Sequence, residues 1–182
     1  MTMARADRHD RPRTPPPPLD RERLDRLALR YVERYATTRG RLVQYLTRKL
    51  RERGWEGDTG PDLQALADRF AQLGYIDDRL YGEAKATAMA RRGLGKRRIA
   101  DTLRHAGLDV EDRDALAPDI AQREEESAMT FARRKRIGPF AMTAPDRAQA
   151  QKQIAAMLRA GHSFDTARRI VAMVPGQDSI EG

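Results

Sequence analysis

The chain has 182 residues, a charged fraction of 34%, an aromatic fraction of 5% and no cysteine. The lack of cysteine excludes disulfides, thiol catalysis and zinc sites built on cysteine, and it fits a reducing compartment. No apolar stretch approaches 18 residues and no apolar leader opens the sequence, so we expect a cytoplasmic protein without a membrane partner. The formal net charge of +8 favours an acidic protein or a nucleic acid as partner, although some basic soluble proteins bind neither.

Residues 1–18 hold five of the ten prolines and few large apolar side chains. The run Pro15 to Pro18 favours an extended polyproline conformation. We predict a disordered tail here, with a proline-rich docking motif as the alternative. Residues 175–182 are predicted to form a second, short tail.

Between the tails, apolar residues recur at i, i+3, i+4 and i+7, which predicts an all-α fold. The first stripe runs from Leu24 to Ala36. The second runs from Leu42 to Leu50, after a helix cap at Thr37 or Thr38. The later predicted helices cover about residues 61–73, 77–92, 95–106, 112–121, 124–136, 145–160 and 163–174.

The glycines that end three of these helices are regularly spaced. Gly54, Gly107 and Gly161 are 53 and 54 residues apart, and a large apolar residue lies four positions before each. This pitch suits three short helices per repeat, although helix-ending glycines are common enough to coincide. We therefore predict an elongated tandem array of three three-helix repeats, covering residues 19–75, 76–121 and 122–174.

Lysine and arginine come in blocks. Residues 91–105 and residues 39–53 each contain six of them against one acidic residue, and residues 133–136 form a third block. If equivalent helices of the repeats align, the blocks form one electropositive face for a protein partner or DNA. The alternative is solvated helix faces with i, i+4 pairs such as Arg97 with Asp101. The candidate binding residues are Arg48, Lys49, Arg91, Arg92, Lys96, Arg97, Arg98, Arg104, Arg133, Arg134, Lys135 and Arg136.

The segment 109–126 has the opposite charge, with eight acidic residues against two arginines. Such a segment repels DNA, and it suits a basic protein surface or the basic helices of this same chain. The alternative is a solvated linker with acidic residues at a helix start, where they are electrostatically favourable.

Catalytic chemistry finds little support. Gly95-Lys96 is followed by Arg97, where a phosphate-binding loop needs Ser or Thr. The three histidines are far apart and lack the spacing of metal ligands. Asp77 and Asp78 are adjacent at a predicted helix start, which indicates capping rather than catalysis. We predict no catalytic residue, no metal and no cofactor.

The few aromatic residues are predicted to have structural roles. Tyr75 and Tyr81 flank the Asp77-Asp78 turn and are expected to brace it, while Trp55 is expected to pack. They are too few to predict a stacking platform for single-stranded nucleic acid. The residues expected in the core are Tyr31, Tyr35, Phe70, Phe131 and Phe164.

The sequence from residue 74 to residue 107 resembles the signature of the RecX family of bacterial regulators. The matching residues are Gly74-Tyr75-Ile76-Asp77-Asp78, Tyr81, Arg91-Arg92-Gly93, Gly95, Arg98, Ile99, Leu103 and Gly107. Residues 160–165, AGHSFD, resemble the C-terminal motif of the family, and the likeness covers about residues 24–174. Asp77, Asp78, Tyr81, Gly93 and Gly107 are the residues we assign to the structural motif.

The resemblance implies tandem three-helix repeats and binding to filaments of the RecA recombinase on DNA. It also implies a non-enzymatic protein that mainly restrains filament growth, ATP hydrolysis, strand exchange and coprotease activity, and so regulates DNA repair and the SOS response. Some members bind DNA, and we expect a monomer. The chain departs from the family at Thr38-Arg39-Gly40-Arg41, where Ser-Arg-x-Glu is frequent, so a capping box is missing.

The sequence also allows two other classes of function. A helical nucleic-acid-binding protein would place the basic helices directly on DNA phosphates. A purely structural adaptor would use the acidic segment and the proline-rich tail.

Overall fold

The computed structural model describes residues 16–176, and over this range it contains helices and no strand, so the predicted all-α class is confirmed. The predicted tails, residues 1–18 and 175–182, lie mostly outside the described range. In chain order the elements are α1 (Arg21–Arg34), α2 (Arg39–Arg53), α3 (Leu63–Gln72), α4 (Asp78–Ala90), α5 (Lys96–His105), α6 (Val110–Gln122), α7 (Glu124–Lys135), the 3-10 helix η1 (Gly138–Phe140), α8 (Arg147–Ala160) and α9 (Phe164–Val171).

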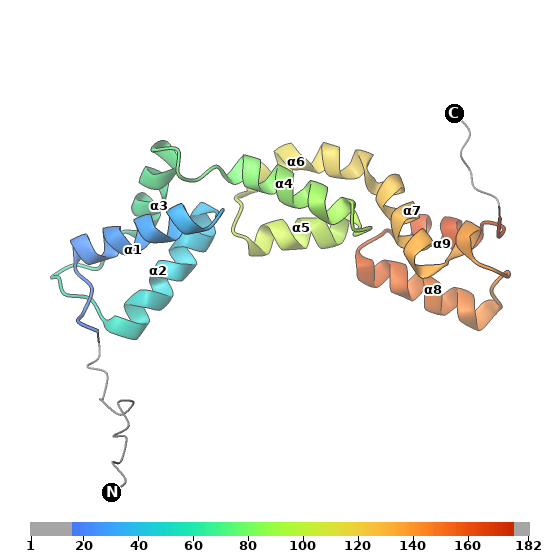
Figure 1. Ribbon diagram of the computed structural model, residues 1–182, viewed down its shortest axis with the longest axis horizontal. Helices are drawn as coiled ribbons and strands as arrows, with labels where there is room; N and C mark the ends of the chain where they lie inside the picture. Colours follow the sequence, from blue (N-terminus) through green and yellow to red (C-terminus); the bar gives the residue numbers. More distant parts are fainter. Residues whose placement is uncertain (1–15, 177–182) are drawn as a thin grey trace, which may run out of the picture.

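The helices gather into three groups that follow one another along the long axis of an elongated molecule (Figure 1). We call them unit 1 (α1–α3), unit 2 (α4–α6) and unit 3 (α7–α9 with η1). Each unit has its own cluster of buried apolar residues. Helices of this length are marginal in isolation, so packing within a unit supplies most of their stability. The residue-by-residue division into repeats stays a prediction.

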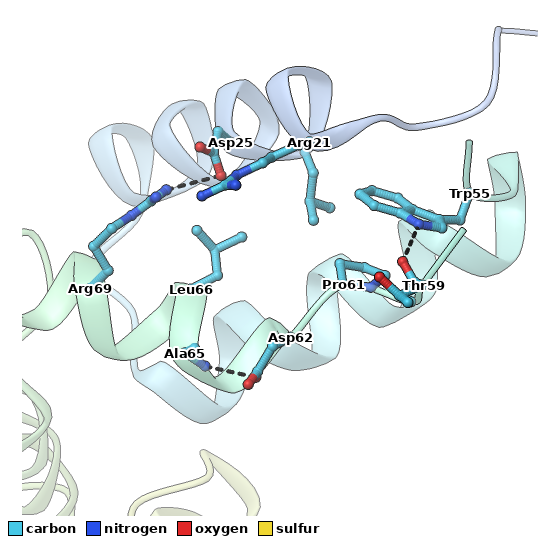
Figure 2. A pocket seen from close by; sticks show the side chains of 11 residues that line it. Arg21, Asp25, Trp55, Thr59, Pro61, Asp62, Ala65, Leu66 and Arg69 are labelled. Atoms are coloured by element: carbon cyan, nitrogen blue, oxygen red, sulfur yellow. Dashed lines mark hydrogen bonds and ion pairs between the residues drawn. The ribbon is translucent and has the colours of Figure 1, made fainter. Parts of the chain in front are cut away.

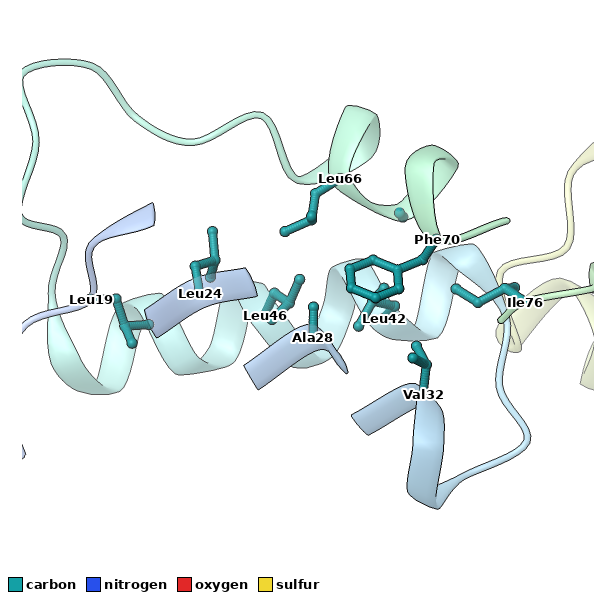
Figure 3. Close-up of a cluster of buried hydrophobic side chains, with 10 residues drawn as sticks. Leu19, Leu24, Ala28, Val32, Leu42, Leu46, Leu66, Phe70 and Ile76 are labelled. Atoms are coloured by element: carbon teal, nitrogen blue, oxygen red, sulfur yellow. The ribbon is translucent and has the colours of Figure 1, made fainter. Parts of the chain in front are cut away.

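The core of unit 1 shows how a unit is built. Leu42 and Leu46 of α2 are fully buried, and they lie among Ala28 of α1 and Phe70 of α3 (Figure 3). Each fully buried leucine contributes about 1.5–3 kcal/mol relative to an exposed one. Ile76, beyond α3, closes this cluster at the end that faces unit 2.

Side-chain caps mark most of the helix starts. The Thr38 hydroxyl accepts a hydrogen bond from the Arg41 N–H at 3.1 Å, and α2 has no capping box, as its sequence predicts. Asp77 caps α4 by accepting from the Leu80 N–H at 2.8 Å. Asp78 does not cap α4; its side chain is buried and serves another purpose, described below.

Several aromatic and apolar residues at helix ends are more exposed than predicted. Phe70 is buried as expected, but Tyr35 and Phe164 are 49% and 55% exposed, so their assignment to the core is wrong. Because α1 ends at Arg34 and Tyr35 has an extended backbone, the predicted stripe does not continue to Tyr35. Leu73 is 63% exposed for a similar reason, since it caps the C-terminal end of α3.

Helices α2, α5 and α8 form a row along one side of the molecule, which we call the helix row (Figure 1). The helices are arranged head to tail. The end of α8 meets the start of α5, and the end of α5 meets the start of α2. The contact between α8 and α5 is called junction 2–3, and the contact between α5 and α2 is called junction 1–2, after the units that they join.

At junction 2–3, backbone groups of α5 and α8 satisfy one another. The N–H of Gly95 donates to the Ala160 carbonyl at 2.9 Å, and the N–H of Arg97 donates to the Gly161 carbonyl at 3.2 Å. A helix start has unpaired N–H groups and a helix end has unpaired carbonyls, so the contact replaces the side-chain cap that α5 lacks. Glycine is required here, because a Cβ at Gly95 would overlap the backbone of Gly161.

At junction 1–2, side chains make the corresponding contact. The buried Thr38 hydroxyl donates to the Ala106 carbonyl, and Gly40 lies against Gly107, where a Cβ would come within 2.6 Å of the Gly107 Cα. The guanidinium of Arg39 pairs with Asp78 of α4 at 2.8 Å. The two units are thus joined by close backbone contact and by a buried carboxylate.

Candidate partner-binding surface

Positive charge is concentrated on the helix row. Helices α2, α5 and α8 contain thirteen Lys and Arg residues against two acidic residues. Helices α4 and α6 of the central unit contain three against six. The row therefore carries a continuous excess of positive charge that its neighbours in unit 2 do not share, and such a distribution favours an acidic or phosphate-bearing partner.

Helix α5 separates an apolar face from a basic one. Ile99 and Leu103 are buried in the core of unit 2, whereas the four predicted basic residues are exposed. Asp101 pairs with Arg104 at 2.9 Å and not with Arg97, the pair that the i, i+4 alternative predicts. The basic residues of α5 are Lys96, Arg97, Arg98 and Arg104.

Two of these cations have ion-pair partners and two do not. Lys96 reaches across junction 2–3 to Glu124 of α7 at 2.7 Å. Arg97 and Arg98 make no ion pair with any residue between 16 and 176. These two arginines are the part of α5 with the most charge available to a partner.

The candidate residues of α2 are partly neutralised. Arg48 and Lys49 both pair with Glu52, at 3.6 and 2.6 Å. Both cations also lie over the ring of Tyr45, at 5.7 and 5.9 Å from its centroid. They add less net charge to the surface than α5 does.

The basic block at residues 133–136 meets the block at residues 91–105 in space. The Arg134 guanidinium donates to the carbonyl of Arg92 at 2.5 Å, which places the end of α7 beside the turn that follows α4. Arg133 lies 4.9 Å from the ring centroid of Phe140, and its neighbours Lys135 and Arg136 are exposed. Arg91 and Arg92 are exposed on the same turn. Junction 2–3 thus joins two blocks that lie about 40 positions apart in the sequence.

Several residues of the sequence signature lie at the joints between units. Gly93 has φ 75° and leaves no room for a side chain against the backbone of Phe131, and Gly107 adjoins Gly40. Tyr81 lies under the guanidinium of Arg41, 5.2 Å from its ring centroid. Gly93, Gly107 and Tyr81 therefore lie where one unit meets the next.

The acidic segment folds back on basic residues in three places, one of which is the ion pair of Glu125 with Arg169 of α9. Asp109 and Asp112 pair with Arg39 at 2.9 and 3.4 Å, and Glu124 pairs with Lys96. The backbone N–H of Asp112, together with Arg39, lowers the pKa of Asp109 below its ordinary value. Burial, followed by the nearby charges of Asp109 and Asp78, raises the pKa of Asp112.

His162 is the one fully buried histidine among the described residues, and it lies at junction 2–3. Its Nε2 lies 3.1 Å from the Gly93 carbonyl, while Nδ1 has no hydrogen-bond partner. Burial lowers the pKa of His162 because it disfavours the charged ring. No local pattern predicts this role for His162, since its hydrogen-bond partner Gly93 lies 69 positions away.

A pocket of about 440 Å³ opens between α1 and α3 in unit 1 (Figure 2). Trp55 lines it and donates to the Thr59 carbonyl at 2.8 Å, so this side chain packs as predicted. Asp25 holds Arg69 at 2.9 Å and Asp62 caps α3. Because both carboxylates already have these structural partners, we assign the pocket no catalytic role.

Between residues 16 and 176, the structure contains no group of three or more His, Asp and Glu side chains arranged to hold a metal ion. Within the same range, every helix is too short or too polar to cross a membrane.

The comparison with known proteins points to one family. The regulatory protein RecX of Myxococcus xanthus is 31% identical over 160 residues, covering 84% of this chain and 86% of that protein. The RecX protein of Halorhodospira halophila is 30% identical over 152 residues, covering 83% of this chain and 88% of that protein. No family model matches the chain.

Solved structures agree with this fold. The crystal structure of RecX from Lactobacillus salivarius has a TM-score of 0.62 and 22% identity, covering 82% of this chain and 93% of that one. A second crystal structure of a regulatory protein RecX has a TM-score of 0.59 and 21% identity, covering 82% of this chain and 70% of that one. The chain therefore belongs to the RecX family of regulatory proteins.

Proposed function

We propose that the chain binds RecA recombinase filaments on DNA through the helix row and restrains their activity. The observation that carries the proposal is the charge of the row, thirteen basic residues against two acidic ones, on an elongated molecule of a regulatory family. An extended basic row fits a partner with a repeating acidic or phosphate-bearing surface. The three units would contact successive protomers of the filament.

Within this proposal, α5 makes the central contact. Arg97 and Arg98 are exposed and lack ion pairs among residues 16–176, so binding would cost no internal salt bridge there. Contacts of this kind set the association rate and the register more than the raw affinity. Restraint of filament growth, ATP hydrolysis, strand exchange and coprotease activity follows if the bound protein obstructs the protomer surfaces.

The proposal includes no enzymatic step. The protein acts as a monomer in the cytoplasm and regulates DNA repair and the SOS response through the recombinase. Its relatives are named regulatory proteins, which supports a role without chemistry of its own.

The same positive row supports a second candidate, direct binding to DNA phosphates. Fluorescence anisotropy with bare single-stranded DNA and with RecA-coated DNA, each over a salt series, separates the two. We expect tighter binding to the coated strand. If the bare strand binds as tightly, with a steep salt dependence that the double variant Arg97→Glu and Arg98→Glu reduces, the row is a phosphate-binding surface and the filament proposal fails.

A further inference from the structure

A groove of about 570 Å³ between α1 and α2 collects three of the five tyrosines of the chain. Tyr31 stacks on Tyr45 with 4.2 Å between ring centroids and an interplanar angle of 13°. Tyr35 is tilted toward Tyr31 at 5.3 Å and is 49% exposed. The tyrosines thus form one aromatic wall that is open to solvent at Tyr35. We call this site the tyrosine groove.

The same groove is lined by basic residues from both helices, Arg30 and Arg34 from α1 and Arg48 and Lys49 from α2. Glu52 pairs with the two cations of α2. Arg30 and Arg34 are exposed and make no ion pair among the described residues. Two uncompensated charges therefore lie beside the aromatic wall.

The guanidinium of Arg34 lies 5.5 Å from the ring centroid of Tyr35. A flat ring and a cation at this spacing match a nucleotide, whose base stacks while its phosphate pairs with arginine. An acidic peptide would use the cations but would leave the tyrosine ring without a stacking partner. A duplex keeps the faces of its bases inside its own stack, so the arrangement favours a single strand.

We propose that the tyrosine groove binds single-stranded nucleic acid, with a base stacked on Tyr35 and phosphates held by Arg30 and Arg34. The site goes beyond the proposed function, because it lies on unit 1, recognises bases as well as charge and needs no recombinase. It borders the helix row at Tyr45, Arg48 and Lys49 of α2.

The test uses the full chain and a fluorescent oligothymidine of about 12 nucleotides, a length within the site sizes of single-strand binders. Tyr35→Leu should weaken binding roughly 10-fold, the typical loss of one stacked base. Tyr35→Phe keeps the ring and should bind like the parent chain. Tyr75→Leu is the matched control, because Tyr75 is 47% exposed and lies outside the groove, and it should change binding by less than about twofold.

A second probe of the same length without bases separates stacking from charge. The parent chain should bind this abasic strand more weakly than oligothymidine, and Tyr35→Leu should bind both equally. Arg34→Gln should reduce the salt dependence by about 0.7 in log–log slope, the value for one phosphate on a single strand.

Equal binding of the two probes by the parent chain would overturn the proposal, as would an equal loss in the Tyr75→Leu control. If Tyr35→Leu weakens binding to RecA-coated DNA and leaves oligothymidine binding unchanged, the groove is a protein-docking surface instead. Charge reversal on α5 tests the filament proposal separately, so the two proposals can fail independently.

Discussion

The two junctions of the helix row have similar backbone arrangements and different side-chain chemistry. At each junction, the end of one helix abuts the start of another. The Ala106 carbonyl accepts a hydrogen bond from Thr38 at junction 1–2, and the Ala160 carbonyl accepts one from Gly95 at junction 2–3. Junction 1–2 uses a threonine hydroxyl and the ion pairs of Arg39. Junction 2–3 uses backbone N–H groups and the buried ring of His162.

The comparison indicates that close backbone approach is the shared requirement and that each junction fixes it by its own means. Glycine permits the approach in both cases, Gly40 with Gly107 and Gly95 with Gly161. Junction 1–2 should weaken when the side chain of Arg39 is removed, whereas junction 2–3 should weaken when a fall in pH protonates His162. The two joints should therefore fail under different conditions.

The largest effect should come from side chains placed in the backbone contacts. Gly40→Ala and Gly95→Ala should each destabilise the protein by about 3 kcal/mol, because the new methyl group meets backbone atoms rather than a flexible side chain. Thermal and chemical denaturation measure the loss. Gly60→Ala, where nothing lies within 4 Å, is the control and should be nearly neutral. A harmless Ala at either junction would show that the helices do not meet as described.

Removal of the ionic clamp should have the next largest effect, and only at junction 1–2. Arg39→Met removes the guanidinium and leaves the buried carboxylate of Asp78 with the backbone N–H of residue 39 alone. We expect a loss of about 2 kcal/mol, below the usual cost of breaking a buried pair because Arg39 is partly exposed. Arg26→Met, which breaks an exposed pair with Glu22, is the matched control. Hydrogen exchange should increase between units 1 and 2; a uniform increase over all three units would argue against a local clamp.

A smaller, pH-dependent effect should belong to junction 2–3. Burial lowers the pKa of His162, so the unfolded chain binds a proton more readily than the folded one. The contribution of His162 to the free energy of unfolding should be fully present above the ordinary histidine pKa of about 6.5. It should decrease as the pH falls below that value, by about 1 kcal/mol between pH 7.5 and 5.5.

The variant His162→Gln isolates this contribution. Its amide can still donate to the Gly93 carbonyl, but it does not titrate. Urea denaturation of the parent chain and the variant at the two pH values provides the measurement. The same slope in both proteins would assign the pH dependence to other groups.

Much of the fold is predictable from the sequence because helix periodicity, caps and terminal glycines are local signals. Thr38, Asp77 and Ser163 begin helices as their positions predict. The alignment of the helices in the row is less predictable. Leu46 and Ile99 each lie eight residues before a helix-ending glycine, so the glycine spacing makes them equivalent. The junction contacts instead make Thr38 equivalent to Gly95, which places Leu42 in the position of Ile99, one turn earlier. The difference arises because α2 is longer than α5.

The candidate surface is predictable only in part. The basic blocks are visible in the sequence, and two of them lie on the helix row. Pairing of Lys96 with Glu124, contact of Arg134 with Arg92 and collection of three tyrosines in one groove depend on tertiary structure. No local pattern encodes these contacts, because each joins residues from two different helices or turns, up to 42 positions apart in the sequence.

Charge reversal on α5 tests whether the helix row binds the recombinase filament. The double variant Arg97→Glu and Arg98→Glu is compared with Arg21→Glu and Arg26→Glu on α1, which changes the net charge equally outside the row. Inhibition of RecA ATP hydrolysis by each protein is the measurement. We predict that the α5 variant loses inhibition while its helicity and melting stay nearly unchanged, and that the α1 variant still inhibits. Undiminished inhibition by the α5 variant would show that the filament does not bind at α5 of the helix row.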